Sequence, residues 1–236
     1  MSVIFRVDAS LQMGSGHVMR CLTLADELRQ RGTDVKFVCR EHPGNMIGFI
    51  EAKGFPVARL PQPEIEYVAK PDDLAHAAWL GVSWQVDASD TLNAVGETAP
   101  RWLIIDHYAV DYRWEAVLHP HVGKIMVIDD LADRRHDCDL LLDQNLYLGM
   151  ETRYDALLPN SCERLLGPKY ALLRPEFAAA RKRLRRRDGN VRRVLVFFGG
   201  VDSTNETEKT LRVLAGIDGR QFDVDVVVGG ATPHKE

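Results

Sequence analysis

Short apolar runs alternate with longer amphipathic stretches through most of the chain. The apolar runs are rich in β-branched residues or leucine, and most are apolar throughout, which is typical of strands covered on both faces. The pattern predicts strands at residues 3–7, 35–39, 57–60, 102–106, 125–129 and 139–142. Strands that alternate with helices form parallel βαβ units, so we predict an α/β fold with a doubly wound sheet.

The stretches between these strands predict helices, of which the clearest covers residues 17–31. Its apolar residues recur at spacings of three and four and form one stripe: Val18, Cys21, Leu22, Leu24, Ala25 and Leu28. Gly32 follows at the position where a glycine commonly ends a helix, after arginines in the last turn. Further helices are predicted near residues 45–53, 75–95 and 112–118.

A second pattern of the same kind begins late in the chain. It consists of a helix at 175–188, a strand at 194–198, a helix at 203–215 and a strand at 222–228. We therefore predict an N-terminal Rossmann-like domain (1–174), a linker helix (175–190) and the start of a second Rossmann-like, nucleotide-binding domain (191–236). A unit this small leaves an edge of its parallel sheet exposed. We therefore expect either that the chain is truncated or that another element covers that edge.

Bulk composition is that of a globular protein, with 45% apolar and 27% charged residues, enough to bury a core without disulfides. The net charge of −4 gives no reason to expect nucleic acid or an anionic membrane as a partner, and no obligate protein partner is evident. Arg6 and Asp8 interrupt the N-terminal apolar run too early for a signal peptide. The cysteines are widely spaced and favour free thiols, so we expect a cytoplasmic protein.

Two features have competing interpretations. The basic run at 181–187 suggests nucleic-acid binding or a solvated helix face, and we favour the second because the charge is confined to one helix. The tryptophans are interpreted as core residues in preference to a platform for sugar stacking: Trp79, Trp84, Trp102 and Trp114.

The loop between the first strand and the first helix is a candidate site. Ligands of open α/β sheets bind outside the carboxyl ends of the strands. The loop contains Gly14, Ser15 and Gly16, and its glycines let the backbone approach a phosphate or a sugar. The helix that follows offers free N–H groups. The motif is not GxGxxG, so it does not indicate a nicotinamide cofactor.

His17 lies in the first turn of that predicted helix. Because a helix N-terminus disfavours the imidazolium ion, we expect a neutral ring that can accept a proton from water as a general base. The alternative is a residue that only caps the helix.

Polar residues also follow two later strands. Asp106, His107 and Tyr108 end one strand, and Asp129 and Asp130 end the next. Parallel strands end at the same edge of the sheet, so we expect these side chains to gather along one rim with the first loop. The alternative is that the aspartates of the later pair cap turns and that Tyr108 only packs at the rim.

These motifs together resemble one enzyme family. They are 5–10 (FRVDAS), 14–21 (GSGHVMRC), 104–108 (IIDHY), 128–130 (IDD), 138–145 (CDLLLDQN), 170–177 (YALLRPEF) and 198–202 (FGGVD). The chain resembles the PseG family, the UDP-2,4-diacetamido-2,4,6-trideoxy-β-L-altropyranose hydrolases of pseudaminic acid biosynthesis, over nearly its whole length. The resemblance implies a GT-B-like fold similar to that of MurG, with the UDP side mainly in the C-terminal domain.

The resemblance also implies a reaction: water attacks the anomeric carbon of a UDP-sugar with inversion, and neither a metal nor another cofactor takes part. His17 is then the expected base and Tyr108 assists. The predicted substrate-binding residues are Gly14, Ser15, Gly16, Asp106, His107, Asn145, Arg174, Gly199 and Gly200. Family members continue beyond this chain, so we expect a C-terminal truncation and an incomplete nucleotide pocket.

Other functions stay open from the residues alone. A glycosyltransferase differs only in its acceptor, and a non-catalytic fragment would bind the nucleotide-sugar without turnover. A metalloenzyme would use His119, His121 and residues 129–139, but no metal-site spacing is present. The Gly199–Gly200 pair favours either phosphate binding at the next helix or a tight turn.

Overall fold

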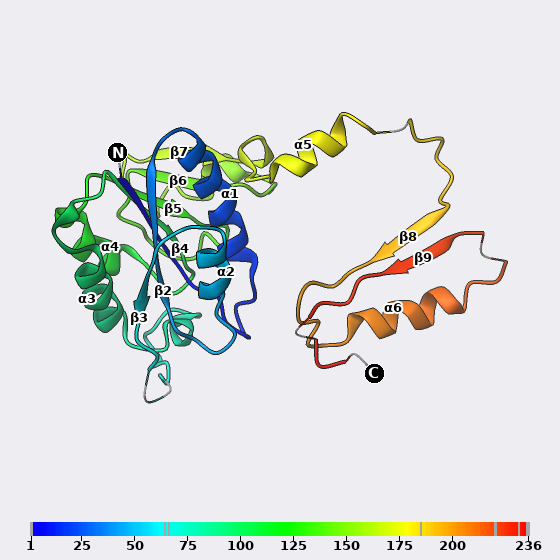
Figure 1. The fold of residues 1–236 in the computed structure, drawn as a ribbon, viewed down its shortest axis with the longest axis horizontal. Helices are drawn as coiled ribbons and strands as arrows, with labels where there is room; N and C mark the ends of the chain where they lie inside the picture. The colour runs from blue at the N-terminus through cyan, green and yellow to red at the C-terminus, as the bar shows by residue number, and fades with distance from the viewer. Residues whose placement is uncertain are drawn as a thin grey trace. The chain divides into compact units, whose positions relative to one another are not determined.

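The computed structural model describes residues 2–63, 65, 67–184, 186–219, 221–230 and 232–234. The chain divides into two compact units, Met1–Arg174 and Pro175–Glu236 (Figure 1). Within the described residues, no helix has both the length and the apolar character that crossing a membrane requires.

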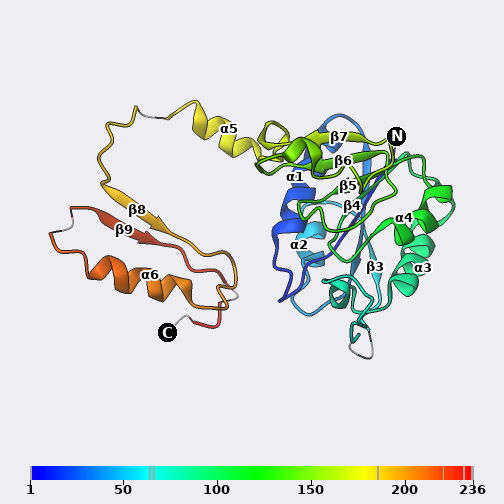
Figure 2. The same cartoon turned by 180° about the vertical axis from the view of Figure 1, so that it is seen from behind.

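A seven-stranded parallel sheet forms the centre of the first unit (Figures 1 and 2). Its strands are β1 (Ser2–Val7), β2 (Asp34–Arg40), β3 (Val57–Leu60), β4 (Trp102–Asp106), β5 (Ile125–Ile128), β6 (Leu140–Asp143) and β7 (Glu163–Leu166). The strand order is β3-β2-β1-β4-β5-β6-β7. The order therefore reverses between β1 and β4, which is where a doubly wound sheet opens a crevice. The predicted α/β fold class is confirmed.

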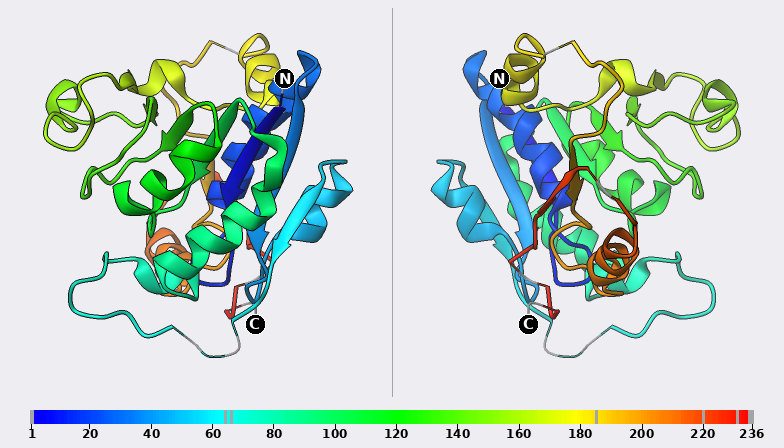
Figure 3. Two further views of the ribbon diagram at one scale, coloured as in Figure 1. Left: turned by 90° about the vertical axis from the view of Figure 1, so that its left-hand side faces the viewer. Right: turned by 90° about the vertical axis from the view of Figure 1, so that its right-hand side faces the viewer.

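Helices cover both faces of this sheet (Figure 3). Helices α1 (Gly16–Gln30) and α2 (Ile47–Ala52) pack on one face, and α3 (Trp84–Val95) and α4 (Tyr112–Leu118) on the other. Successive residues of a strand point to opposite faces. Val3 and Phe5 therefore join the α1/α2 side of the core, whereas Ile4 joins the α3/α4 side.

Helix α1 ends as its sequence predicts. The Thr33 N–H donates to the Leu28 carbonyl at 3.0 Å and the Gly32 N–H to the Arg29 carbonyl at 2.9 Å. Gly32 has φ 78°, a left-handed conformation that a glycine adopts without strain. These two bonds form a Schellman motif and satisfy carbonyls at the helix end.

The single helix predicted over residues 75–95 is wrong. The segment forms a short 3₁₀ helix, η1 (Ala77–Leu80), and then α3. Gly81, with φ 72°, ends η1, and the Ser83 side chain accepts from the Val86 N–H at 3.4 Å to cap α3. The other 3₁₀ helices among the described residues are η2 (Gly96–Thr98), η3 (His119–His121), η4 (Met150–Thr152) and η5 (Pro168–Tyr170).

The second unit contains α5 (Pro175–Arg181), β8 (Arg193–Val196), α6 (Glu206–Ala215) and β9 (Asp223–Val226). Strands β8 and β9 pair in parallel. Helix α5 ends at Arg181, so most of the basic run at 181–187 follows the helix. Our expectation that the charge of this run is confined to one helix is therefore wrong. Arg185 lies outside the described residues. Helix α6 begins three residues later than predicted, because Asp202 accepts the N–H groups of Glu206 and Thr207.

Candidate active site

The loop after β1 is braced before it enters α1. The Ser10 carbonyl accepts the Gly14 N–H at 2.9 Å, and the Ser10 hydroxyl accepts the N–H groups of Gln12 and Met13 at 3.2 and 3.1 Å. Gly14 has φ 72°, in the left-handed region that favours glycine. This turn starts α1 at Gly16 and places His17 in its first turn, as predicted.

His17 is held by a buried carboxylate. Its Nδ1 lies 2.6 Å from Oδ1 of Asp106, whose side chain is fully buried at the end of β4. Arg20 donates to the same carboxylate from Nε at 2.5 Å and from Nη2 at 2.7 Å. Burial alone would raise the pKa of Asp106, but the Arg20 hydrogen bonds and His17 hold this pKa at about 2.

Two groups face Nδ1 of His17, the Asp106 carboxylate at 2.6 Å and Arg20 Nη2 at 3.3 Å, and the shorter contact favours one tautomer. An ionised carboxylate only accepts hydrogen bonds, so Nδ1 of His17 carries the proton that faces Asp106. The lone pair is then on Nε2, on the other side of the ring. A ring oriented in this way can take a proton from water, as a general base must.

A second carboxylate, Asp130, extends the network. It accepts from the Tyr108 hydroxyl, from Arg20 Nη1 at 3.1 Å and from Asn145 Nδ2 at 3.1 Å. The Tyr108 ring stands edge-on to the His17 ring, with centroids 4.6 Å apart. Burial and then Asp130 raise the pKa of Tyr108, so its hydroxyl stays protonated and acts as a donor.

Strand alternation explains which rim residues meet. Asp106 and Asp130 point to the α1 face and reach Arg20 on that helix. His107 and Asp129, one residue away in each case, turn to the opposite face. Asp129 accepts the Ala132 N–H at 2.9 Å, as a turn-capping residue does. All of these residues lie at the carboxyl edge of the sheet, as expected, but only Asp106, Tyr108 and Asp130 join the network of His17.

His107 belongs instead to a buried network that the sequence analysis missed. Its Nε2 lies 3.4 Å from Asp8, which pairs with Arg6 at 2.7 Å. Arg6 also pairs with Asp87 of α3 at 2.6 Å, and Arg40 joins Asp87 at 2.8 Å. Charged residues inside apolar strands were the available signal, because buried charges require partners. Any role of His107 in substrate binding stays a prediction.

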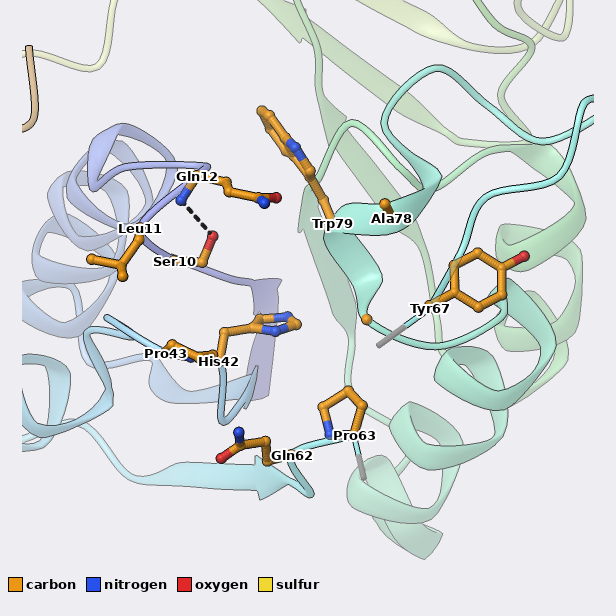
Figure 4. A pocket seen from close by; sticks show the side chains of 11 residues that line it. Ser10, Leu11, Gln12, His42, Pro43, Gln62, Pro63, Tyr67, Ala78 and Trp79 are labelled. Atoms are coloured by element: carbon orange, nitrogen blue, oxygen red, sulfur yellow. Dashed lines mark hydrogen bonds between the residues drawn. The ribbon is translucent and has the colours of Figure 1, made fainter. Parts of the chain in front are cut away.

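A cavity of about 390 Å³ lies beside this site (Figure 4). Its walls come from the loops that follow β1, β2 and β3 and from η1: Ser10, Leu11, Gln12, His42, Pro43, Gln62, Pro63, Tyr67, Ala78, Trp79 and Gly81. Among the described residues, Trp79 forms the wall that adjoins His17, with ring centroids 6.3 Å apart, and it stacks on Tyr108 at 5.8 Å. The core interpretation holds for Trp114, which is fully buried, whereas Trp79 is only partly buried.

The remaining predicted residues lie later in the chain. Arg174 is exposed at the end of the first unit, and Gly199 and Gly200 belong to the second unit. Their roles stay predictions. Among the described residues, no group of three or more His, Cys, Asp or Glu side chains is arranged to hold a metal ion. The four cysteines are free and buried.

Comparison with known proteins gives a clear relative. The chain is 31% identical over 206 residues to the UDP-2,4-diacetamido-2,4,6-trideoxy-β-L-altropyranose hydrolase of Campylobacter jejuni, a match that covers 87% of this chain and 62% of that protein. The chain is a relative of this hydrolase. The resemblance drawn from the motifs is confirmed.

A second match is broader but more distant. An uncharacterized protein of Methanocaldococcus jannaschii is 26% identical over 234 residues, which cover 97% of this chain and 43% of that protein. The chain thus spans less than two thirds of the length of either relative. No family model matches the chain.

Solved structures confirm the GT-B-like fold. MurG of Acinetobacter baumannii matches with a TM-score of 0.51 and 11% identity, over 96% of this chain and 67% of that one. The calicheamicin glycosyltransferase CalG4 matches with a TM-score of 0.52 and 13% identity, over 98% of this chain and 66% of that one. At sequence identities this low, the structural similarity supports the fold assignment and nothing about function.

Proposed function

We propose that this chain serves a UDP-sugar hydrolase that releases UDP and a 2,4-diacetamido-2,4,6-trideoxy sugar, in pseudaminic acid biosynthesis. The activity of the Campylobacter jejuni relative supports the substrate class. The observation that carries the proposal is the contact of 2.6 Å between His17 Nδ1 and the buried Asp106 carboxylate, which leaves Nε2 to act as a base.

The proposed step is a single displacement at the anomeric carbon. A water oxygen bonds to that carbon while Nε2 of His17 takes the water proton. The bond from the anomeric carbon to the phosphate oxygen breaks, and its electron pair leaves with UDP. The sugar is inverted because water enters on the face opposite UDP. Asp106 stabilises the imidazolium that forms, as the carboxylate of a catalytic triad does.

The neighbouring residues would position the reactants. Trp79 offers an aromatic wall beside His17, against which the apolar side of a sugar can pack. Arg20 and Tyr108 hold the carboxylates of Asp106 and Asp130 in place. Backbone N–H groups at Gly14–Gly16 are proposed to receive negative charge from the diphosphate. Substrate binding by Gly199 and Gly200, which form a turn after β8 in the second unit, is a separate proposal.

The test is release of UDP from UDP-2,4-diacetamido-2,4,6-trideoxy-β-L-altropyranose in ¹⁸O-labelled water, with no acceptor added. We expect ¹⁸O in the sugar and none in UDP. His17→Ala is expected to slow release by about 10² to 10⁴-fold, the usual contribution of a general base. His121→Ala, at an exposed histidine of the same unit, is the matched control and keeps the wild-type rate. Label in UDP, or a His17→Ala rate equal to that of the control, would overturn the proposal.

Two other functions remain as alternatives. The fold shared with MurG and CalG4 favours a glycosyltransferase as the second candidate. That function predicts UDP release only when a sugar or other hydroxyl acceptor is added. A non-catalytic fragment predicts binding of the UDP-sugar without release of UDP under either condition.

A further inference from the structure

A second histidine–aspartate pair borders the cavity from the side of β1 and β2. His42 lines the cavity, yet its side chain is only 8% exposed, and its Nε2 lies 3.6 Å from Oδ2 of the fully buried Asp8. Asp8 follows β1, and Asp106 ends β4, the neighbouring strand. His42 belongs to none of the motifs in the sequence, and the proposed hydrolysis does not use it.

The surroundings of Asp8 indicate which tautomer of His42 the site favours. Oδ1 of Asp8 forms an ion pair with Arg6 Nη1 at 2.7 Å and accepts the Arg40 backbone N–H at 2.7 Å. Oδ2 faces Nε2 of His107 at 3.4 Å, and His107 accepts the Ala109 N–H at Nδ1, so its Nε2 carries a proton. Oδ2 itself forms no hydrogen bond, and the Nε2 atom of His42 lies 3.6 Å from it as an ion-pair neighbour. Because a carboxylate oxygen attracts a proton on the facing nitrogen, we assign the proton of neutral His42 to Nε2 and its lone pair to Nδ1.

The lone-pair edge of His42 faces the cavity. Gly81, another wall residue, has φ 72°, and a Cβ placed there would lie 3.0 Å from Cε1 and 3.5 Å from Nδ1 of His42. The absence of a side chain at Gly81 keeps this edge of the ring open. Figure 4 shows the imidazole projecting into the cavity between Ser10 and Pro63. Nδ1 of His42 is therefore a hydrogen-bond acceptor that a ligand in the cavity can reach, and the Asp8 carboxylate lies near the Nε2 side of the ring.

We propose that His42 Nδ1 accepts the N–H of an acetamido group of the sugar and makes the site selective for N-acetylated substrates. The inference rests on the proposed function and names the residue that recognises its substrate. The remaining parts of an acetamido group also find partners on the wall. Pro43 and Pro63 suit the methyl group. Ser10 Oγ accepts two backbone N–H groups, which leaves its proton to donate to the acetamido carbonyl oxygen.

Three substitutions separate substrate recognition from a structural role. An asparagine side chain places a polar atom near the position of Nδ1, and a glutamine places one near Nε2. If His42 binds the sugar, His42→Asn keeps most of the affinity, whereas His42→Gln and His42→Phe lose about tenfold or more, the effect of one missing hydrogen bond in a closed site. If His42 only supports Asp8, His42→Gln keeps wild-type affinity and thermal stability, and His42→Asn loses both.

The probes are free 2,4-diacetamido-2,4,6-trideoxy-L-altropyranose and its 2,4-di-O-acetyl ester analogue, which lacks the N–H, titrated into the full chain by NMR. We expect wild type and a His121→Phe control to prefer the amide by about tenfold, and His42→Phe to bind both sugars equally. A preference that survives in His42→Phe, or no binding of the amide sugar by wild type, would overturn the inference.

The two proposals fail in distinguishable ways. If selectivity for the amide sugar depends on His42 but no UDP is released from the UDP-sugar, the hydrolase proposal is contradicted and the inference about His42 is supported. Release of UDP that depends on His17, with a His42→Phe variant as selective as wild type, would do the opposite.

Discussion

Replacing Asp106 with asparagine tests whether the buried carboxylate stabilises the first unit through its charge. Asp106 is fully buried and accepts three short hydrogen bonds, one from His17 and two from Arg20. The fold lowers its pKa from 3.8 to about 2. A difference of this size corresponds to about 2.5 kcal/mol of folding free energy at neutral pH. We therefore expect Asp106→Asn to destabilise the unit by about that amount at pH 7.

The pH dependence has a defined sign. The folded pKa lies below the unfolded one, so the unfolded chain binds more protons in this range and the stabilisation grows with pH. It is complete above about pH 5, falls to about 1.3 kcal/mol near pH 3, and disappears below about pH 2. The difference between wild type and Asp106→Asn should shrink in the same way as pH falls.

Urea unfolding followed by tryptophan fluorescence measures this difference. All four tryptophans belong to the first unit, so the signal reports that unit alone. Asp26→Asn is the control, because Asp26 forms only an exposed ion pair with Arg29 and should cost less than about 1 kcal/mol. A variant as stable as wild type at pH 7, or a difference that does not shrink on acidification, would show that the charge of Asp106 does not stabilise the first unit.

Two further substitutions test the site and the core. Tyr108→Phe removes the hydroxyl that donates to Asp130 but keeps the ring beside His17. The rate of UDP release should fall by about tenfold, and the free energy of unfolding in urea should change by less than about 1.5 kcal/mol. An unchanged rate would rule out a role for the hydroxyl. Trp114→Phe removes a fully buried indole whose Nε1 donates to Asp87 at 3.0 Å, so the free energy of unfolding should fall by about 2 to 4 kcal/mol, as measured by thermal unfolding with circular dichroism. The control is Trp102→Phe at a partly buried position, which should cost less than about 1.5 kcal/mol. Equal losses would contradict the importance of the Asp87 contact.

Much of the fold follows from local pattern. Strands β3 and β4 and helix α4 occupy the predicted residues, and α1 ends at Gly32 as its sequence indicates. Strand β7 was missed because it is a four-residue edge strand with Glu163 and Arg164 at its start, too short and polar for the apolar-run criterion. The break before α3 had a signal in Gly81 and Ser83, which the apolar pattern across the segment obscured.

The candidate site was predictable in part, because the ends of adjacent parallel strands meet. That rule brings Asp106 and Tyr108 to His17. Extending the strand alternation by one residue would have separated His107 from them. The pairing of Arg6 with Asp87, 81 positions apart, was not predictable, because no local pattern specifies which buried charges from distant segments meet.

The role of His17 as the base is tested most directly by the tautomer of its ring, read from long-range ¹H–¹⁵N couplings at mildly alkaline pH. We predict a proton on Nδ1 and none on Nε2 in wild type, with that preference lost in Asp106→Asn. A wild-type ring protonated on Nε2 would leave no lone pair for water, and the proposed base would have to be sought elsewhere.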